Sequence, residues 1–293
     1  MKLLILAGAA VGFLAAQTPD ARQTPDVNEI MSRVGINQAK SRELRTQWIY
    51  QQKQTLRMVR ASGKTAREEH REYLVLPDRR GVKKELTSFD GKYLQHGAYF
   101  NYDKPGYEYK SLDLDGSLIT QMSEDMTNEK ESADGIESDL FPMTYHQQLK
   151  YVFQLKGGPV EYRGHRVWRV AFEPEGKGSI LDADESGCAI WKGEALIDAD
   201  EFQPVAVTTS MAAKMPAAIR ILLGTNIKGL GFSLSYQKVA DGIWFPVSYG
   251  GEFEVTGLFF YKRTMSISLV NSGFRHADVT SNIAFAKDEK DGK

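Results

Sequence analysis

Hydrophobic and polar residues alternate one by one between positions 190 and 209, where the sequence reads IWKGEALIDADEFQPVAVTT. Ala195 and Ile197 fall on one side of this alternation and charged residues fall on the other, which is typical of a β-strand with one buried face. After an acidic turn, a second run places Val205 and Val207 on a common face. The stretch therefore predicts a β-hairpin.

The same period of two returns along most of the chain and predicts about ten strands. The connections between these runs are short, whereas a parallel crossover needs a dozen or more residues, so we expect an antiparallel meander. Asp90 and Gly91 form a typical tight-turn pair and predict a hairpin of their own. The other predicted strands run over 48–60, 65–76, 82–89, 92–95, 150–155, 232–237, 244–255 and 258–270, and residues 161–172 are predicted to contain a hairpin centred on Gly164.

Helical spacing of apolar residues is confined to short segments. Asp26 and Glu29 form a pattern similar to a capping box, and we expect the helix that they start to end at Gly35. Further short helices are expected over 37–44, 117–127 and 216–224, the last two starting at Ser117 and Pro216.

A sheet of this size twists strongly, so it curls, and its concave apolar face needs a cover. The predicted helices are the available covers. The sequence thus predicts a mainly β protein of the α+β class, built as a large curled antiparallel sheet, or half-barrel, with a few short helices as its lid. Because no linker rich in Pro, Gly or Ser separates the strands, we expect one domain.

The N-terminus has the pattern of a bacterial secretory signal. Lys2 precedes an apolar run that is too short to span a bilayer, and we expect cleavage after Ala16. An uncleaved anchor is the alternative. After cleavage, the protein is expected in the periplasm or outside the cell and not as an integral membrane protein. The expected division is a signal peptide over 1–16, a flexible leader over 17–25, the β domain over 26–275 and a polar tail over 276–293.

Composition narrows the class of protein further. The 293 residues are 42% hydrophobic and 26% charged, as in ordinary globular proteins. The 37 basic and 38 acidic residues nearly balance, which argues against a nucleic-acid partner because such a partner needs a basic stripe. Cys188 is the single cysteine, so core packing must hold the fold without an intramolecular disulfide, and no lipid-attachment cysteine follows the signal.

One short segment has part of the pattern of a calcium loop. Asp182, Asp184, Ser186 and Gly187 match its first, third, fifth and sixth positions, where oxygen ligands alternate before a sharp turn. Position twelve, however, is Gly193 instead of a carboxylate. An acidic surface loop without a metal ion is therefore the alternative.

No catalytic constellation is visible in the sequence. The five histidines are scattered without the spacing of zinc ligands, and no Gly-x-Ser-x-Gly motif marks a serine nucleophile. The glycines between 224 and 231 lack the Gly-Lys-Ser/Thr ending of a phosphate loop. We therefore expect no catalytic residues, no cofactor and no enzymatic activity.

Aromatic residues are the remaining resource for binding. Many lie in predicted strands, and a curled sheet with few helices leaves an apolar pocket if its concave face is not filled. For any single aromatic residue, a place in a packed core is the alternative. The candidate ligand-binding residues on the concave face are Trp48, Phe153, Trp168, Trp191, Phe232, Tyr236, Trp244 and Phe260.

Four pieces of the sequence carry a resemblance to a known family: WKGEALID at 191–198, FQPV at 202–205, DGIWFPVSYG at 241–250 and LFFYKRTMSISL at 258–269. Together they resemble bacterial outer-membrane lipoprotein-sorting proteins of the LolA/LolB-like type. The resemblance implies a half-barrel with helices as a lid and a cavity for acyl chains. It also implies that related members serve as stress sensors that contact a membrane-protein partner.

Two functions follow as expectations. The first is a periplasmic binding protein that holds a lipid or acylated ligand in the concave face of the sheet, without catalysis. The second is a regulatory or scaffold protein of the cell envelope that contacts a protein partner through the sheet edge and lid. A hydrolase ranks last because no nucleophile, base or metal set is visible.

Overall fold

The computed structural model describes residues 25–78, 81–127, 143–176, 191–212, 226–257 and 260–277. The predicted signal peptide, the helix expected over 216–224 and the candidate calcium ligands Asp182, Asp184 and Ser186 lie outside these residues. So do residues 17–24 of the expected leader and 278–293 of the expected tail. The division of the chain into these segments stays a prediction.

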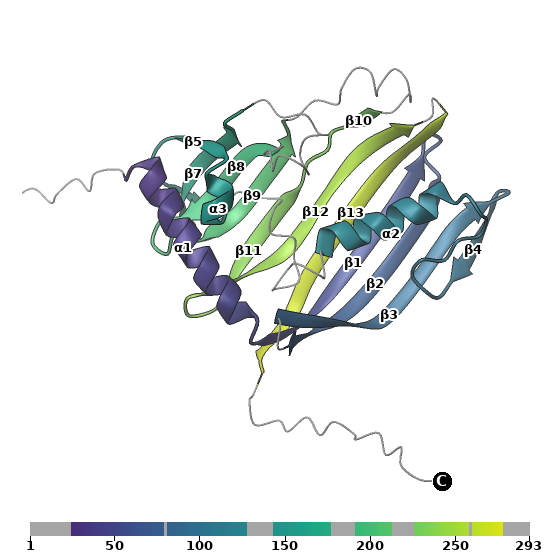
Figure 1. The fold of residues 1–293 in the computed structure, drawn as a ribbon, viewed down its shortest axis with the longest axis horizontal. Helices are drawn as coiled ribbons and strands as arrows, with labels where there is room; N and C mark the ends of the chain where they lie inside the picture. The colour runs from purple at the N-terminus through teal and green to yellow at the C-terminus, as the bar shows by residue number, and fades with distance from the viewer. Residues whose placement is uncertain are drawn as a thin grey trace, which may run out of the picture.

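Within the described part of the chain, thirteen strands form one antiparallel sheet that does not close into a barrel (Figure 1). The order is β4-β3-β2-β1-β13-β12-β11-β9-β8-β7-β5, with β10 paired to β12 and β6 paired to β7. This confirms the predicted mainly β class and the open, half-barrel type of sheet. The strands are β1 (Trp48–Arg60), β2 (Thr65–Asp78), β3 (Gly81–Gln95), β4 (Ala98–Tyr102), β5 (Tyr151–Leu155), β6 (Val160–Tyr162), β7 (His165–Pro174), β8 (Trp191–Asp198), β9 (Pro204–Met211), β10 (Asn226–Lys228), β11 (Ser233–Ala240), β12 (Ile243–Gly257) and β13 (Tyr261–His276).

The pairing of β1 with β13 joins the two halves of the sheet. Trp48 lies opposite His276, and Arg60 lies opposite Arg263 at the other end of the pair. Strands β2, β3 and β4 therefore extend the sheet beyond β1, and the later strands extend it beyond β13 (Figure 1). A single sheet results.

Three helices in the described residues lie on the same side of the sheet (Figure 1): α1 (Val27–Arg45), α2 (Leu114–Thr127) and α3 (Tyr145–Gln148). Ile30 of α1 and Ile119 of α2 are fully buried, in one cluster with Leu56 of β1 and Ile267 of β13. We call this side of the sheet the helix-covered face. The covering role expected for the helical segments over 26–44 and 117–127 is confirmed.

Alternation in β1 shows how the sequence selects this face. Every second residue from Trp48 to Met58 is buried, whereas the residues between them are exposed or half-buried. Because successive side chains of a strand point to opposite faces, the buried set shares one side with Leu56. The period of two that predicted the strand therefore also identified its inner face.

The first helix is longer than predicted, because Gly35 does not end it and no break precedes residue 37. A Cβ atom at Gly35 would lie 3.4 Å from the backbone nitrogen of Tyr145 in α3. A Cβ atom would therefore make only an ordinary van der Waals contact there, and Gly35 is an interior helix residue and not a C-cap.

The predicted hairpin at Asp90 and Gly91 is wrong, because β3 runs through both residues. Gly91 pairs with Tyr102 of β4, and a Cβ atom at Gly91 would lie 2.4 Å from the Tyr102 ring. The glycine makes room for that ring. The actual turn is formed by His96 and Gly97, both of which have positive φ angles, as a two-residue hairpin turn requires.

Side-chain amides tie α1 to the turn between β8 and β9. Asn37 Nδ2 donates to the Glu201 carbonyl at 2.7 Å, and Gln203 Nε2 donates to Ser41 Oγ at 3.0 Å. Gln38 Nε2 donates to the Gln203 side-chain oxygen, and both residues are buried. The hairpin predicted from residues 190–209 therefore positions the helix that covers its half of the sheet.

Replacing Gly91 by Ala is expected to destabilise the protein by about 1–3 kcal/mol, because the new methyl group would overlap the buried Tyr102 ring. Gly158→Ala is the matched control, since no atom lies within 4 Å of a Cβ atom there. Urea unfolding measures both variants. Equal midpoints for the two would contradict the role assigned to Gly91.

Candidate functional site

Five of the eight predicted aromatic residues lie on the helix-covered face. Trp168 belongs to the main core cluster, and Phe153, Phe232 and Tyr236 pack against that cluster. Trp191 shares the face of Ala195 in β8, and its ring lies 5.2 Å from the Phe232 ring, measured between centroids. The structure therefore brings these five side chains onto one surface. Their role in ligand binding stays a prediction.

Trp48 lies at the end of β1 in a separate small cluster, where its ring packs 5.8 Å from the ring of Phe245. Phe260 is 81% exposed and precedes β13 instead of lying within a strand. Its predicted place on the concave face is wrong. The run of apolar residues around 258–260 suggested a strand start, but β13 begins only at Tyr261.

Trp244 is fully buried in a separate small cluster with Val167 and Val205. It lies opposite Lys238 of β11, and Tyr236 of the same strand packs against both this cluster and the main one. The Trp244 indole Nε1 donates to Glu201 Oε2 at 2.9 Å. Trp244 thus belongs to a cluster next to the main one, and its role in ligand binding stays a prediction.

A cavity of about 510 Å³ opens where β10 and β11 meet β12 and the end of β9. This volume lies in the range of small-molecule sites. The predicted residue Phe232 is one of its walls, and Met211, Ile227 and Leu230 supply further apolar surface. The remaining lining residues are Thr209, Ser210, Gly229, Gly231, Ser233, Gly250, Gly251 and Glu252.

Glycines in this cavity permit close backbone approach. A Cβ atom at Gly251 would lie 2.2 Å from the Gly231 carbonyl oxygen, and one at Gly231 would lie 2.3 Å from the Thr209 carbonyl oxygen. These contacts explain the two glycines as sheet residues and not as parts of a phosphate loop. They also fix the cavity at a break in the pairing of β12, whose neighbour changes there from β10 to β11.

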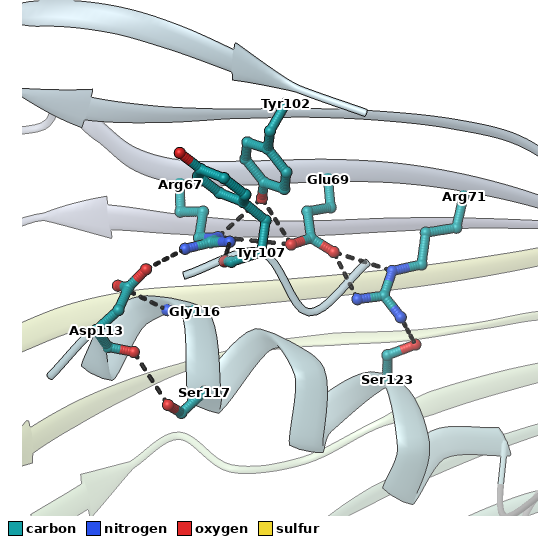
Figure 2. A network of polar contacts seen from close by, with 9 residues as sticks. All are labelled: Arg67, Glu69, Arg71, Tyr102, Tyr107, Asp113, Gly116, Ser117 and Ser123. Atoms are coloured by element: carbon teal, nitrogen blue, oxygen red, sulfur yellow. Dashed lines mark hydrogen bonds and ion pairs between the residues drawn. The ribbon is translucent and has the colours of Figure 1, made fainter. Parts of the chain in front are cut away.

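A network of buried charges lies on the same helix-covered face, over β2 (Figure 2). Arg67, Glu69 and Arg71 occupy alternate positions of β2, so they all point toward the helices, and each is at least nine-tenths buried. Arg71 Nε donates to Glu69 Oε2 at 2.9 Å, and Arg67 Nε lies 3.5 Å from Glu69 Oε1. One carboxylate thus lies between two guanidinium groups.

The other partners of this network come from β4, α2 and the segment between them (Figure 2). Arg67 Nη1 donates to Asp113 Oδ2 at 2.6 Å, and Arg71 Nη1 donates to Ser123 Oγ at 2.7 Å. Tyr102 Oη donates to Glu69 Oε1 at 2.6 Å. A buried charge is tolerated when it is paired and hydrogen-bonded, and these contacts meet that condition.

The protonation states of the network follow from its geometry. Burial raises the pKa of the Tyr102 hydroxyl, and the adjacent Glu69 carboxylate raises it further, so the hydroxyl stays a hydrogen-bond donor. Burial lowers the pKa of Arg67, but Tyr102, Asp113 and Glu69 outweigh burial and raise it above its ordinary value. Two guanidinium groups and two carboxylates therefore compensate each other.

Asp113 also begins α2. Its Oδ1 accepts a hydrogen bond from the Gly116 amide at 3.1 Å, as an N-cap side chain does, so the helix starts at Leu114 and not after the predicted Ser117. Asp115 in the first turn pairs with Arg263 Nε of β13 at 2.8 Å. Two carboxylates at one end of α2 thus hold it against β2 and β13.

Sequence reasoning missed this network. Residues 67–72 read REEHRE, a run in which both faces of the strand carry charges, so alternation gives no sign of the buried face. The pairing of β2 with β1 was the available signal. Arg67 and Glu69 lie opposite the apolar residues Met58 and Leu56 of β1, and residues that lie opposite each other share a face of the sheet. Asp113 is 46 positions from Arg67 in sequence, and no local pattern connects the two.

The described residues contain no group of three or more His, Cys, Asp or Glu side chains arranged to hold a metal ion. Among the same residues, no helix has the length and apolar character needed to cross a membrane.

Comparison with known proteins yields structural neighbours only. No protein-family model matches the chain, and no curated protein matches it. A putative outer membrane lipoprotein-sorting protein domain from Vibrio parahaemolyticus is 13% identical, with a TM-score of 0.36, and the match covers 85% of this chain and 94% of that one. A DUF1329 family protein from Desulfovibrio piger is 11% identical, with a TM-score of 0.34 and coverages of 88% and 95%.

MucB is a third neighbour, at 10% identity and a TM-score of 0.25, with coverages of 85% and 94%. These neighbours include the kind of protein that the sequence pieces resembled. At such identities and TM-scores they carry no argument about function, which has to come from the residues of this chain.

Glu69→Gln is expected to destabilise the protein by about 3–5 kcal/mol, because two buried guanidinium groups would then face one carboxylate. Glu72→Gln, on the same strand, is the matched control. Glu72 is half exposed in its pair with Lys53, so its loss is expected to cost less than about 1 kcal/mol. Urea unfolding measures the free energy of unfolding of both variants. Similar losses of stability in the two would contradict the role of Glu69 as the shared counter-charge.

Burial raises the pKa of Tyr151 to about 12, although a backbone hydrogen bond from Trp191 lowers it. The unfolded chain loses this proton near pH 10, so between about pH 10 and 12 the folded state holds more protons and stability falls as pH rises. The Tyr151→Phe variant lacks the hydroxyl, so it lacks this contribution to the fall in stability. Unfolding free energies at about pH 8 and pH 11.5 should show the wild type losing more than the variant; equal losses would contradict the shift.

Proposed function

We propose that this protein binds a lipid or an acylated ligand on the helix-covered face of its sheet, without catalysis, in the periplasm or outside the cell. The observation that carries this proposal is the cavity of about 510 Å³ with Met211, Ile227, Leu230 and Phe232 among its walls. Its apolar surface suits an acyl chain, because burying such a chain removes apolar area from water.

The cavity adjoins the covered core. Gly251 in its wall lies opposite Ile267 of β13, a buried member of the main cluster, and Phe232 packs against the same cluster. An acyl chain in the cavity therefore has apolar surface to follow toward α2. The covering helices supply the means to exclude water from that surface.

A second candidate function is contact with an envelope protein, and one observation favours it. Ile36 of α1 and Tyr145 of α3 are 65% and 69% exposed, and the neighbouring Gly35 lies close to the Tyr145 backbone. Exposed apolar side chains gathered where two helices cross are typical of a protein-binding surface. This patch is separate from the cavity, so the two functions are testable independently.

Native mass spectrometry and organic extraction of the protein, purified without detergent from the bacterial envelope, test the binding proposal. We expect stoichiometric co-purifying lipid. Leu230→Trp fills the cavity and is expected to reduce bound lipid by about tenfold or more, whereas Ile36→Trp on exposed α1 leaves it unchanged. A bare mass that persists after incubation with phospholipid and with oleate would contradict the proposal.

A further inference from the structure

The register of the sheet connects the cavity to the buried charges by a short apolar path. Gly251 of the cavity wall lies opposite Ile267, Ile267 lies opposite Leu56, and Leu56 lies opposite Glu69. Three strand spacings of about 4.8 Å place Glu69 about 14 Å from the cavity wall. Ile267 and Leu56 are buried, so this path is apolar from the cavity to the charged network.

Helix α2 covers the charged end of this path. Ile119 of α2 shares the core cluster with Leu56 and Ile267, and Ser123 bonds to Arg71. Figure 1 shows the helix lying across β1 and β13 on the same face. A ligand that follows the path from the cavity therefore has to displace α2.

Displacing α2 changes the charge balance. Arg67 takes its Asp113 carboxylate and its Tyr107 carbonyl partner from the segment that leads into α2, whereas Glu69 stays on β2 (Figure 2). Without that segment, two guanidinium groups on an apolar surface face one carboxylate. An uncompensated buried charge is costly, so an open state needs a negative group from elsewhere.

A spare donor lies at the same place. Gln54 is opposite Arg71 in the neighbouring strand and is 3% exposed. Its side-chain oxygen accepts from Ser123, but its Nε2 is buried without a hydrogen-bond partner in the described residues. Leaving a buried donor unpaired costs free energy, and an oxygen atom of an incoming group would satisfy it.

We propose that Arg67 and Arg71, with Gln54, form the head-group subsite for an amphiphile with a negatively charged head, and that Asp113 holds the place of that head in the closed protein. The tail lies along Leu56 and Ile267 toward the cavity. This rests on the proposed function and adds to it the chemistry of the ligand, a carboxylate or a phosphate joined to an acyl or alkyl chain. Guanidinium groups bind both head groups with paired hydrogen bonds.

The test compares oleate with oleyl alcohol, which has the same chain without the charge, by equilibrium binding to the full-length protein. Asp113→Asn frees Arg67, and we expect it to raise the ratio of oleate to oleyl alcohol affinity by about tenfold or more. Asp115→Asn is the matched control, because it loosens the same end of α2 through Arg263 and leaves the Arg67 pair intact. It is expected to keep the wild-type ratio.

A second variant distinguishes the loss of the Asp113 charge from a folding defect in Asp113→Asn. Arg67→Gln with Asp113→Asn removes both charges and is expected to bind oleyl alcohol but to lose the gain in oleate affinity. Oleoyl lysophosphatidic acid, measured in parallel, shows whether a phosphate or a carboxylate is preferred. An equal ratio in Asp113→Asn and Asp115→Asn overturns the head-group subsite while leaving lipid binding standing; no binding of any probe to any variant overturns both.

Discussion

A buried guanidinium group needs a counter-charge, and the position of α2 depends on that requirement. Arg67 and Arg71 project from β2 onto an apolar face, where Glu69 compensates one of them and Asp113 at the start of α2 compensates the other. Replacing such pairs by apolar residues is often neutral or stabilising, so the charges are not explained by stability alone. They make the closed position of α2 conditional on its carboxylate, which is the property that a displaceable cover needs.

The sheet supplies the frame for this arrangement. The β1–β13 pair joins the first and last strands, so that the cavity near β12 and the charges on β2 share one continuous face. The two covering helices are held differently. Side-chain amides, a hydroxyl and the Arg33 guanidinium over the Phe202 ring attach α1 to the β8–β9 turn, whereas ion pairs with carboxylates attach α2 to β2 and β13. A negatively charged ligand competes directly with the carboxylates of those ion pairs.

Much of the fold was predictable because alternation with one apolar face is a local signal. It identified β1 and the β8–β9 hairpin with nearly correct ends. Glycine was ambiguous, since at Gly91 it makes room for the Tyr102 ring where a turn was expected. The division of the aromatic residues into clusters was not predictable, because the adjacent Trp244 and Phe245 are both buried, in different clusters. The charged network was not predictable, because REEHRE has no apolar face and its partners lie far away in sequence.

If α2 is a cover that an anionic amphiphile displaces, its backbone amides become accessible to solvent when such a ligand binds. Hydrogen–deuterium exchange of the full-length protein with and without saturating oleate measures this displacement. The account predicts faster exchange of the α2 amides in the presence of oleate, with β1 and β13 still protected, because those strands stay paired in the open state. Equal or slower exchange of α2 with oleate bound would contradict it.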